Sequence, residues 1–190
     1  MLKNHRQFIF YLIRFLGIFG ILYGGTLLVI GLSAPGGYYS EFVARHLDYV
    51  SGMKQMIMSN VGMVAGWFGY DTIKEPNFLV RIVGKRGVII AMDCVGYGVY
   101  SFWIAYVISN SGALLRKLGW VVGGLFLLWS INIARVTMFL ISINKNQTMP
   151  LGLDHHTWFN IIAYIAIFGM MWIYERHGSV KHNQNDERNN

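Results

Sequence analysis

Long runs of apolar residues, separated by shorter polar stretches, form the main pattern of this chain. Four runs have 18 or more residues; three of them contain no charged residue, and the fourth contains only Arg135. Because a helix rises about 1.5 Å per residue, each run can cross the roughly 30 Å hydrocarbon core of a bilayer. The pattern therefore predicts four membrane spans, over about residues 8–32, 94–115, 118–143 and 156–175.

The segment 33–93, between the first two predicted spans, is more polar and is expected outside the membrane. Within it, residues 51–69 are rich in Met and Gly and include Lys54, which favours an interfacial or re-entrant helix over a fifth span. Residues 78–90 form two β-prone runs around a Gly-Lys-Arg-Gly turn, which predicts a β-hairpin leading directly towards Cys94. The predicted fold is an all-α polytopic membrane protein with an outer interfacial helix and a short β-hairpin.

The composition agrees with a membrane protein. Of the 190 residues, 54% are hydrophobic and 13% are charged, about half the charge of an ordinary globular domain. The net charge of +7 is spread along the chain rather than gathered in a basic run, which argues against nucleic-acid binding. A single cysteine excludes an internal disulfide and a multi-cysteine metal site. We expect one integral-membrane domain over residues 1–178 and a disordered cytoplasmic tail over 179–190.

Lys and Arg are divided unequally between the two sides of a four-span chain. The side that holds both termini carries eight Lys and Arg residues against three acidic ones, whereas the other side carries seven against six. The positive-inside rule therefore predicts a multi-pass protein of the cell membrane with both termini in the cytoplasm. A fifth span over 51–69 would place the termini on opposite sides and spoil this agreement.

This topology brings several reactive side chains to the extracytoplasmic face. Cys94 lies at the outer start of the second span, and Asp154, His155 and His156 lie at the outer start of the fourth. Arg135 is about 12 Å below the outer end of the third span by helical rise, and its long side chain can extend towards that interface. A thiol, two imidazoles and a guanidinium that meet at one interface are typical of a nucleophile, a base and an anion-stabilising group.

Cys94 and Arg135 each have a plain structural interpretation beside the functional one. A lone cysteine is usually a small buried hydrophobe, although the positive end of a helix dipole would favour its thiolate. An arginine in hydrocarbon costs at least about 2.5–3.5 kcal/mol, which indicates a functional group or an obligatory pairing with Asp154 or backbone carbonyls. Asn132, one helical turn earlier, is placed to orient the guanidinium or to donate to a developing oxyanion.

The two histidines leave further alternatives open. They can simply cap the last helix, with Asp154 as its N-cap, or Asp154 can orient one imidazole as in a hydrolytic triad. A metal site is chemically possible, but His46 and Cys94 are the only further ligands expected on the same side. We therefore predict neither a metal nor a cofactor.

These short motifs resemble the exosortase/archaeosortase family. The resemblance runs over roughly residues 84–172 and is carried by Cys94-Val95-Gly96, by Asn132-Ile133-Ala134-Arg135-Val136 and by His156. Val95 stands where a serine is common in the family, and Asn160 stands where a glycine usually follows the histidine. His156 fits the family spacing better than His155, and the choice between them stays open.

The resemblance implies an integral-membrane cysteine transpeptidase in which Cys94, Arg135 and His156 are catalytic. Its substrates would be membrane-anchored proteins that end in a short motif, a transmembrane helix and a basic tail, and some members are linked to exopolysaccharide production. We predict a membrane-embedded cysteine protease or transpeptidase that acts at the extracytoplasmic face. The alternative is a non-catalytic membrane assembly subunit in which Arg135 holds helices together.

Overall fold

The computed structural model describes residues 2–34, 38–145 and 161–176 of the chain. In chain order the elements are α1 (Leu2–Ser33), α2 (Glu41–His46), α3 (Tyr49–Trp67), β1 (Thr72–Glu75), β2 (Leu79–Ile82), β3 (Gly87–Ile89), the 3₁₀ turn η1 (Met92–Cys94), α4 (Tyr97–Ser109) and α5 (Leu114–Lys145). A further helix covers residues 161–176. The tail predicted to be disordered, 179–190, lies outside the described residues.

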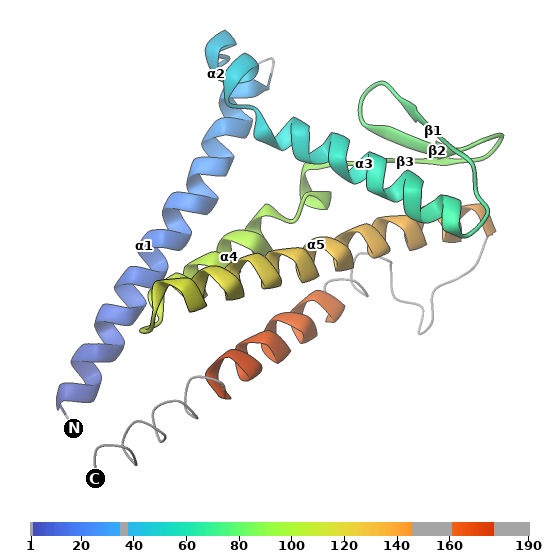
Figure 1. The fold of residues 1–190 in the computed structure, drawn as a ribbon. Helices are drawn as coiled ribbons and strands as arrows, with labels where there is room; N and C mark the ends of the chain where they lie inside the picture. Colours follow the sequence, from blue (N-terminus) through green and yellow to red (C-terminus); the bar gives the residue numbers. More distant parts are fainter. Residues whose placement is uncertain (1, 35–37, 146–160, 177–190) are drawn as a thin grey trace.

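Figure 1 shows two packed parts that share the long helix α5. We call the first part the bundle; it contains α1, α4, the first half of α5 and the helix over 161–176. We call the second part the cap, in which α3 and the small sheet pack on the second half of α5. Trp129 of α5 packs against the cores of both parts, so it marks the junction between them.

The cap follows closely from the alternation of apolar and polar residues. β2 and β3 pair antiparallel as the predicted hairpin, and β1 pairs antiparallel with the other edge of β2. α3 covers most of the segment 51–69, for which an interfacial or re-entrant helix was predicted, and the structure confirms that it is helical. The Asp48 side chain caps α3 by accepting a 3.0 Å hydrogen bond from the Ser51 N–H. The buried side chains of the cap form one core, which includes Ile57, Val61, Val80, Ile82, Val88, Val136 and Leu140.

The far end of α5 is fixed to the hairpin by a pair of hydrogen bonds. The Asn144 side chain accepts from the Arg86 backbone N–H at 2.8 Å and donates to the Arg86 carbonyl oxygen at 3.0 Å. A side-chain amide that pairs with both backbone groups of one residue resembles a short piece of sheet. The hairpin is therefore held on α5, and it leads the chain from the cap into η1.

Two helices of the described chain are long and apolar enough to cross a membrane, namely Arg6–Ser33 and Leu114–Lys145. The other two predicted spans are shorter as helices. α4 has 13 residues, or about 20 Å, and the described helix over 161–176 is about 24 Å long. Both lengths fall below the roughly 30 Å of a bilayer core, so four full spans are not confirmed.

The span predicted over 94–115 is interrupted at both ends. Gly96 precedes α4 with a φ of +80°, a left-handed conformation that glycine adopts without strain. At the other end Asn110 is extended and Gly112 has a φ of +138°, so the helix stops after Ser109. Hydropathy alone does not predict these helix ends, because it depends on the side chains and not on the backbone conformation.

Candidate active site

Cys94 lies at the junction of the bundle and the cap. It is the last residue of η1, and the Cys94 N–H donates to the Ala91 carbonyl oxygen at 3.1 Å. Val95, which follows, is fully buried and anchors the turn. Cys94 itself is half-buried and packs against the cap core. It therefore precedes α4 by three residues, rather than beginning a helix as the sequence suggested.

Arg135 approaches Cys94 from α5, although the two residues are 41 positions apart in the chain. Its Nη2 atom lies 4.0 Å from the Cys94 Sγ atom. A guanidinium stays charged at every physiological pH, and a nearby positive charge favours a thiolate over a thiol. The structure thus brings together the first two residues of the predicted catalytic set.

Asn132 holds the backbone at the same point. Its side-chain amide donates a 2.7 Å hydrogen bond to the Cys94 carbonyl oxygen, and the residue is buried. Because Asn132 and Arg135 lie one turn apart on α5, one side chain holds the Cys94 main chain while the other faces its sulfur. The sequence predicted that Asn132 orients the guanidinium or donates to an oxyanion, whereas in the structure its amide donates to the Cys94 backbone.

The predicted acid–base residues are not placed by this structure. Asp154, His155 and His156 lie outside the described residues. His46, the other ligand considered for a metal, lies on α2, and its ring stacks on Phe42 with the ring centres 4.9 Å apart. In the described part of the chain no three His, Cys, Asp or Glu side chains form a group that could hold a metal ion.

Lys54 is a second cation near the site, and its role was not predicted from the sequence. It lies on α3 with only 6% of its surface exposed, and its Nζ atom is 4.8 Å from the centre of the Phe78 ring. Burial lowers the pKa of Lys54 below its usual value, and the charges of Asp48 and Cys94 act in the opposite direction. The ammonium and the Cys94 sulfur therefore lie within electrostatic reach of each other.

A signal for Lys54 was present in the sequence. It is the only charged residue between Tyr49 and Trp67, just as Arg135 is the only charged residue in its own apolar run. A charge that interrupts an apolar segment is costly to bury, and for that reason it often has a functional role. The rule that identified Arg135 would have identified Lys54 if it had been applied to helices outside the predicted spans.

No protein-family model, no curated protein and no solved structure matches this chain. The function therefore has to be argued from the chemistry of the site: a half-buried thiol, an adjacent guanidinium, a nearby buried ammonium and an amide that fixes the thiol's backbone.

Proposed function

We propose that this protein is a membrane-embedded cysteine transpeptidase or peptidase that acts at the extracytoplasmic face on membrane-anchored proteins. The observation that supports it most directly is the 4.0 Å separation of Cys94 Sγ and Arg135 Nη2. A nucleophile beside a permanent cation suits acyl transfer, because the negative charge that develops there is stabilised in place. The resemblance to exosortases supports the same reaction and supplies the class of substrate.

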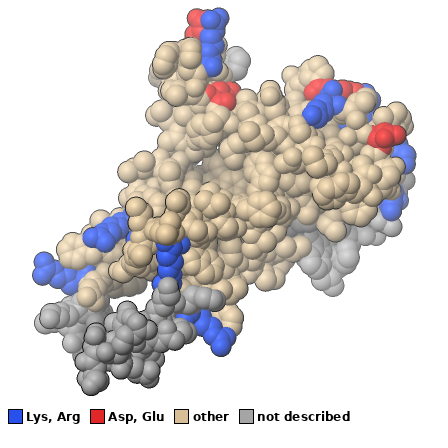
Figure 2. All heavy atoms as spheres, viewed as in Figure 1, with Lys and Arg blue, Asp and Glu red and all other residues tan. Residues whose placement is uncertain are grey.

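The exposed surface of the bundle supports a membrane location. In the most apolar stretch of α1, only 6% is buried inside the protein. The apolar side chains of α1 therefore face outwards along most of the helix. Figure 2 shows a broad uncharged face, with Lys and Arg at the bundle end and both signs of charge near α2 and the cap. Because basic residues prefer the cytoplasmic side, we assign the bundle end to the cytoplasm and the cap to the exterior.

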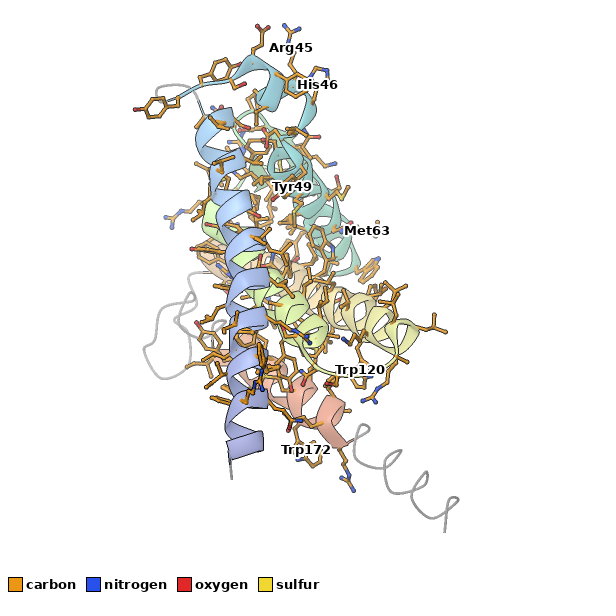
Figure 3. All side chains as sticks on the ribbon, turned by 90° about the vertical axis from the view of Figure 1, so that its left-hand side faces the viewer. Arg45, His46, Tyr49, Met63, Trp120 and Trp172 are labelled. Carbon is orange, nitrogen blue, oxygen red and sulfur yellow. The ribbon has the colours of Figure 1, made fainter. Side chains whose placement is uncertain are left out.

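The height of the site agrees with this orientation. Figure 3 shows Trp120 and Trp172 towards one end of the molecule and Arg45 and His46 at the opposite end. Tryptophans favour the membrane interface, which suits a cytoplasmic boundary near Trp120. From Lys117, close to that boundary, Arg135 lies roughly 27 Å along α5. Arg135 would then lie near the outer edge of a core of about 30 Å.

The proposed reaction uses Cys94, Arg135 and His156 directly, and Lys54 supports it. The Cys94 thiolate attacks the scissile carbonyl carbon, a C–S bond forms, and the carbonyl electrons move to the oxygen, whose charge Arg135 neutralises. As the intermediate collapses, the C–N bond breaks and His156 gives a proton to the leaving amine. His156 then takes a proton from an amine or a water, which attacks the thioester carbonyl. The C–S bond breaks, the Cys94 thiolate leaves, and His156 is again protonated. Lys54 adds a second positive charge that favours the thiolate.

A second candidate, a non-catalytic assembly subunit, is favoured by the Asn132 contact. A hydrogen bond from α5 to the Cys94 backbone joins the two parts of the molecule whether or not the thiol reacts. In this case Arg135 would serve the same structural purpose. The two candidates differ in what they require of the sulfur, which is essential for a transpeptidase and dispensable for an assembly subunit.

The test is processing of a tagged substrate that ends in a motif, a transmembrane helix and a basic tail. We expect Cys94→Ala, Arg135→Ala and His156→Ala to abolish processing while each variant still reaches the membrane. Lys145→Ala, which removes an exposed cation at the end of the same helix as Arg135, is expected to process normally. Full processing by Cys94→Ala would exclude the transpeptidase and favour the assembly subunit.

A further inference from the structure

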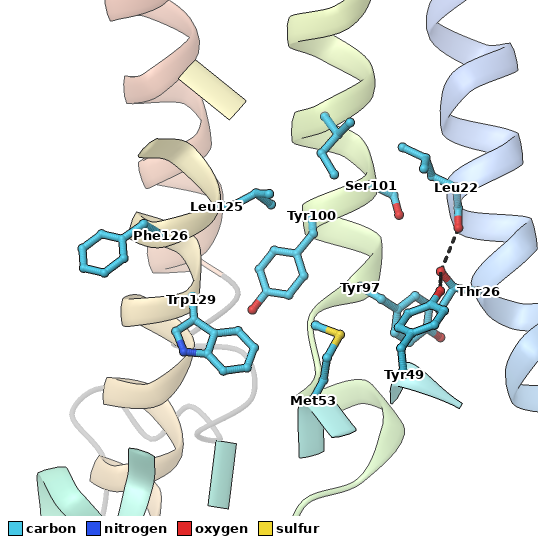
Figure 4. Close-up of a pocket in the computed structure, with 11 residues that line it drawn as sticks. Leu22, Thr26, Tyr49, Met53, Tyr97, Tyr100, Ser101, Leu125, Phe126 and Trp129 are labelled. Carbon is cyan, nitrogen blue, oxygen red and sulfur yellow. Dashed lines mark hydrogen bonds between the residues drawn. The ribbon is translucent and has the colours of Figure 1, made fainter. Parts of the chain in front are cut away.

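A cavity of about 490 Å³ lies between α1, α3, α4 and α5, on the bundle side of the candidate active site. Figure 4 shows its walls, which are mainly apolar and include Leu22, Met53, Leu125, Phe126 and Trp129. This volume is typical of a small-molecule site, for which the range is roughly 300–1,000 Å³. The arrangement is therefore large enough to hold a ligand of the lipid or cofactor class.

Two hydroxyl groups in the wall are already satisfied. Thr26 donates to the Leu22 carbonyl oxygen at 2.8 Å, and the Thr26 and Tyr49 oxygens are 2.6 Å apart, as the dashed lines in Figure 4 show. Because the Thr26 hydrogen goes to Leu22, the Tyr49 hydroxyl donates to Thr26. These two groups do not need a ligand.

Tyr100 is different, because its hydroxyl is buried and makes no hydrogen bond with any described residue. The side chain is 8% exposed and lines the cavity. The Asn132 side chain is a neighbour of this hydroxyl, but the hydrogen bond that its amide makes is the 2.7 Å bond to the Cys94 carbonyl oxygen. A buried hydroxyl without a partner loses its hydration without compensation, so a ligand that accepts a hydrogen bond from Tyr100 would remove that cost.

The size of the cavity favours a thin chain over a helix. A helix 10–12 Å in diameter fills roughly 400–600 Å³ per turn, so the cavity has room for about one turn of a transmembrane segment that needs five or six. An extended hydrocarbon chain is much thinner than a helix, so a longer piece of it can pack against the same cavity walls. Phe126, which lines the cavity, is 73% exposed, so the cavity borders the outer surface of α5.

We propose that this cavity binds one acyl chain of a membrane lipid, whose ester carbonyl accepts a hydrogen bond from Tyr100. The aliphatic part of the lipid packs against the apolar walls, to which α1 and α5 contribute Leu22 and Phe126. Both of these helices are long and apolar enough to cross a bilayer. The Tyr100 ring also touches the position of Gly96, two residues after Cys94. The polar end of the lipid would therefore lie beside the candidate active site, although lipid binding does not depend on catalysis there.

The test uses the full chain in nanodiscs made with phosphatidylethanolamine that carries a diazirine in its acyl chain. We expect photolabelling of the cavity residues Ile104 and Leu125 to exceed labelling of the outward-facing Phe168 severalfold. Ser101→Trp, which fills the cavity, should remove that excess, whereas Ser130→Trp, on an exposed position of α5, should leave it unchanged. Equal labelling of the cavity in Ser101→Trp and the unmodified chain would overturn the proposal, and so would cavity labelling no greater than that of Phe168.

A milder pair of variants covers the case in which Ser101→Trp does not fold. Tyr100→Phe keeps the shape of the cavity and removes the unpaired hydroxyl, while Tyr49→Phe removes a hydroxyl that already has a partner. Native mass spectrometry should show severalfold less retained lipid for Tyr100→Phe and no loss for Tyr49→Phe. Equal retention by both variants would contradict the proposed hydrogen bond. Neither readout requires Cys94 to react, so failure here is distinguishable from failure of the proposed function.

Discussion

The Asn132 side chain donates a hydrogen bond of 2.7 Å to the backbone carbonyl of Cys94, and Arg135, one turn further along α5, lies 4.0 Å from the Cys94 sulfur. One face of one helix therefore fixes both the main chain and the thiol of the candidate nucleophile. A thiol on the short η1 turn, between a hairpin and a helix, would otherwise depend on the turn alone for its position. These contacts explain how two segments that are far apart in the chain, η1 and α5, form a defined arrangement.

Replacement of Asn132 by alanine should destabilise the fold and displace Cys94. The Cys94 carbonyl would lose its partner in a buried position, at a cost of about 1–3 kcal/mol. We expect a lower midpoint of thermal unfolding in detergent and a changed alkylation rate at Cys94. Asn60→Ala is the control, because it makes the same substitution on α3, at an asparagine whose side chain has no hydrogen bond to a described residue. A midpoint for Asn132→Ala equal to that of the control would show that the bond contributes little.

Loss of the Arg135 charge should reduce the reactivity of Cys94. An opposite charge within about 4–6 Å favours the ionised form of a group, so Arg135→Met should slow alkylation by iodoacetamide at pH 7 by roughly tenfold or more. Arg135→Lys should keep part of the rate, because it keeps the charge but loses the planar guanidinium. The rates are measured by mass spectrometry of the only cysteine in the chain. If Arg135→Met reacts as fast as Lys145→Met, the guanidinium does not act on the sulfur.

Local pattern was sufficient for much of the cap. The hairpin was predictable because apolar residues flank a Gly-Lys-Arg-Gly turn, and α3 because its apolar face recurs with the helical period. β1 was not predicted, since two of its four residues, Lys74 and Glu75, are charged and its strand form depends on pairing with β2. The β-propensity of an isolated segment does not predict a strand that forms only by pairing with its neighbour.

For the candidate site, sequence predicted the meeting of Cys94 and Arg135 but not its details. Helical rise and a shared membrane face were enough to bring the two residues to one height. The contact of Asn132 with the Cys94 backbone depends on the η1 turn, which is followed by the left-handed Gly96. Hydropathy does not predict this turn, so the contact could not be predicted. The unpaired Tyr100 hydroxyl was beyond sequence reasoning, because the cavity that it lines is formed by four helices.

Lys54 should make the stability of the protein depend on alkaline pH. Burial lowers the pKa of Lys54 in the folded chain, whereas in the unfolded chain it stays near the usual value of 10.5. Between these two pKa values the unfolded state binds more protons, so the free energy of unfolding should rise with pH across that window. Below the window both states are protonated and the folded state carries the full cost of the buried ammonium.

Lys54→Met should therefore be more stable than the unmodified protein at pH 7. Between pH 7 and the ordinary lysine pKa of 10.5, its free energy of unfolding should change less than that of the unmodified protein. Thermal unfolding at a series of pH values measures both effects. Lys74→Met is the matched control, since Lys74 is exposed and its Nζ atom donates to Ser59 at 2.8 Å. The same variant should also lower the alkylation rate of Cys94, because it removes a charge that favours the thiolate. A stable Lys54→Met protein with unchanged thiol reactivity would assign Lys54 a purely structural role.

The contact between α4 and α5 depends on the absence of a side chain at Gly124. A Cβ atom at Gly124 would overlap the Trp103 indole, which is fully buried and donates from Nε1 to the Trp120 carbonyl oxygen at 3.0 Å. Gly124→Ala must therefore displace the indole, at a cost of about 1–3 kcal/mol for overpacking. Loss of the indole hydrogen bond would add about 1 kcal/mol.

Gly123, the adjacent residue, provides a sharp control, because a Cβ atom there meets nothing within 4 Å. Gly123→Ala should be neutral or stabilising by up to about 1 kcal/mol, since alanine favours a helix more than glycine does. Thermal unfolding of the two variants in the same detergent, with tryptophan fluorescence as a readout of the indole, separates the two effects. Because the substitutions are identical in chemistry and one position apart, equal midpoints would mean that α4 and α5 do not pack through Trp103.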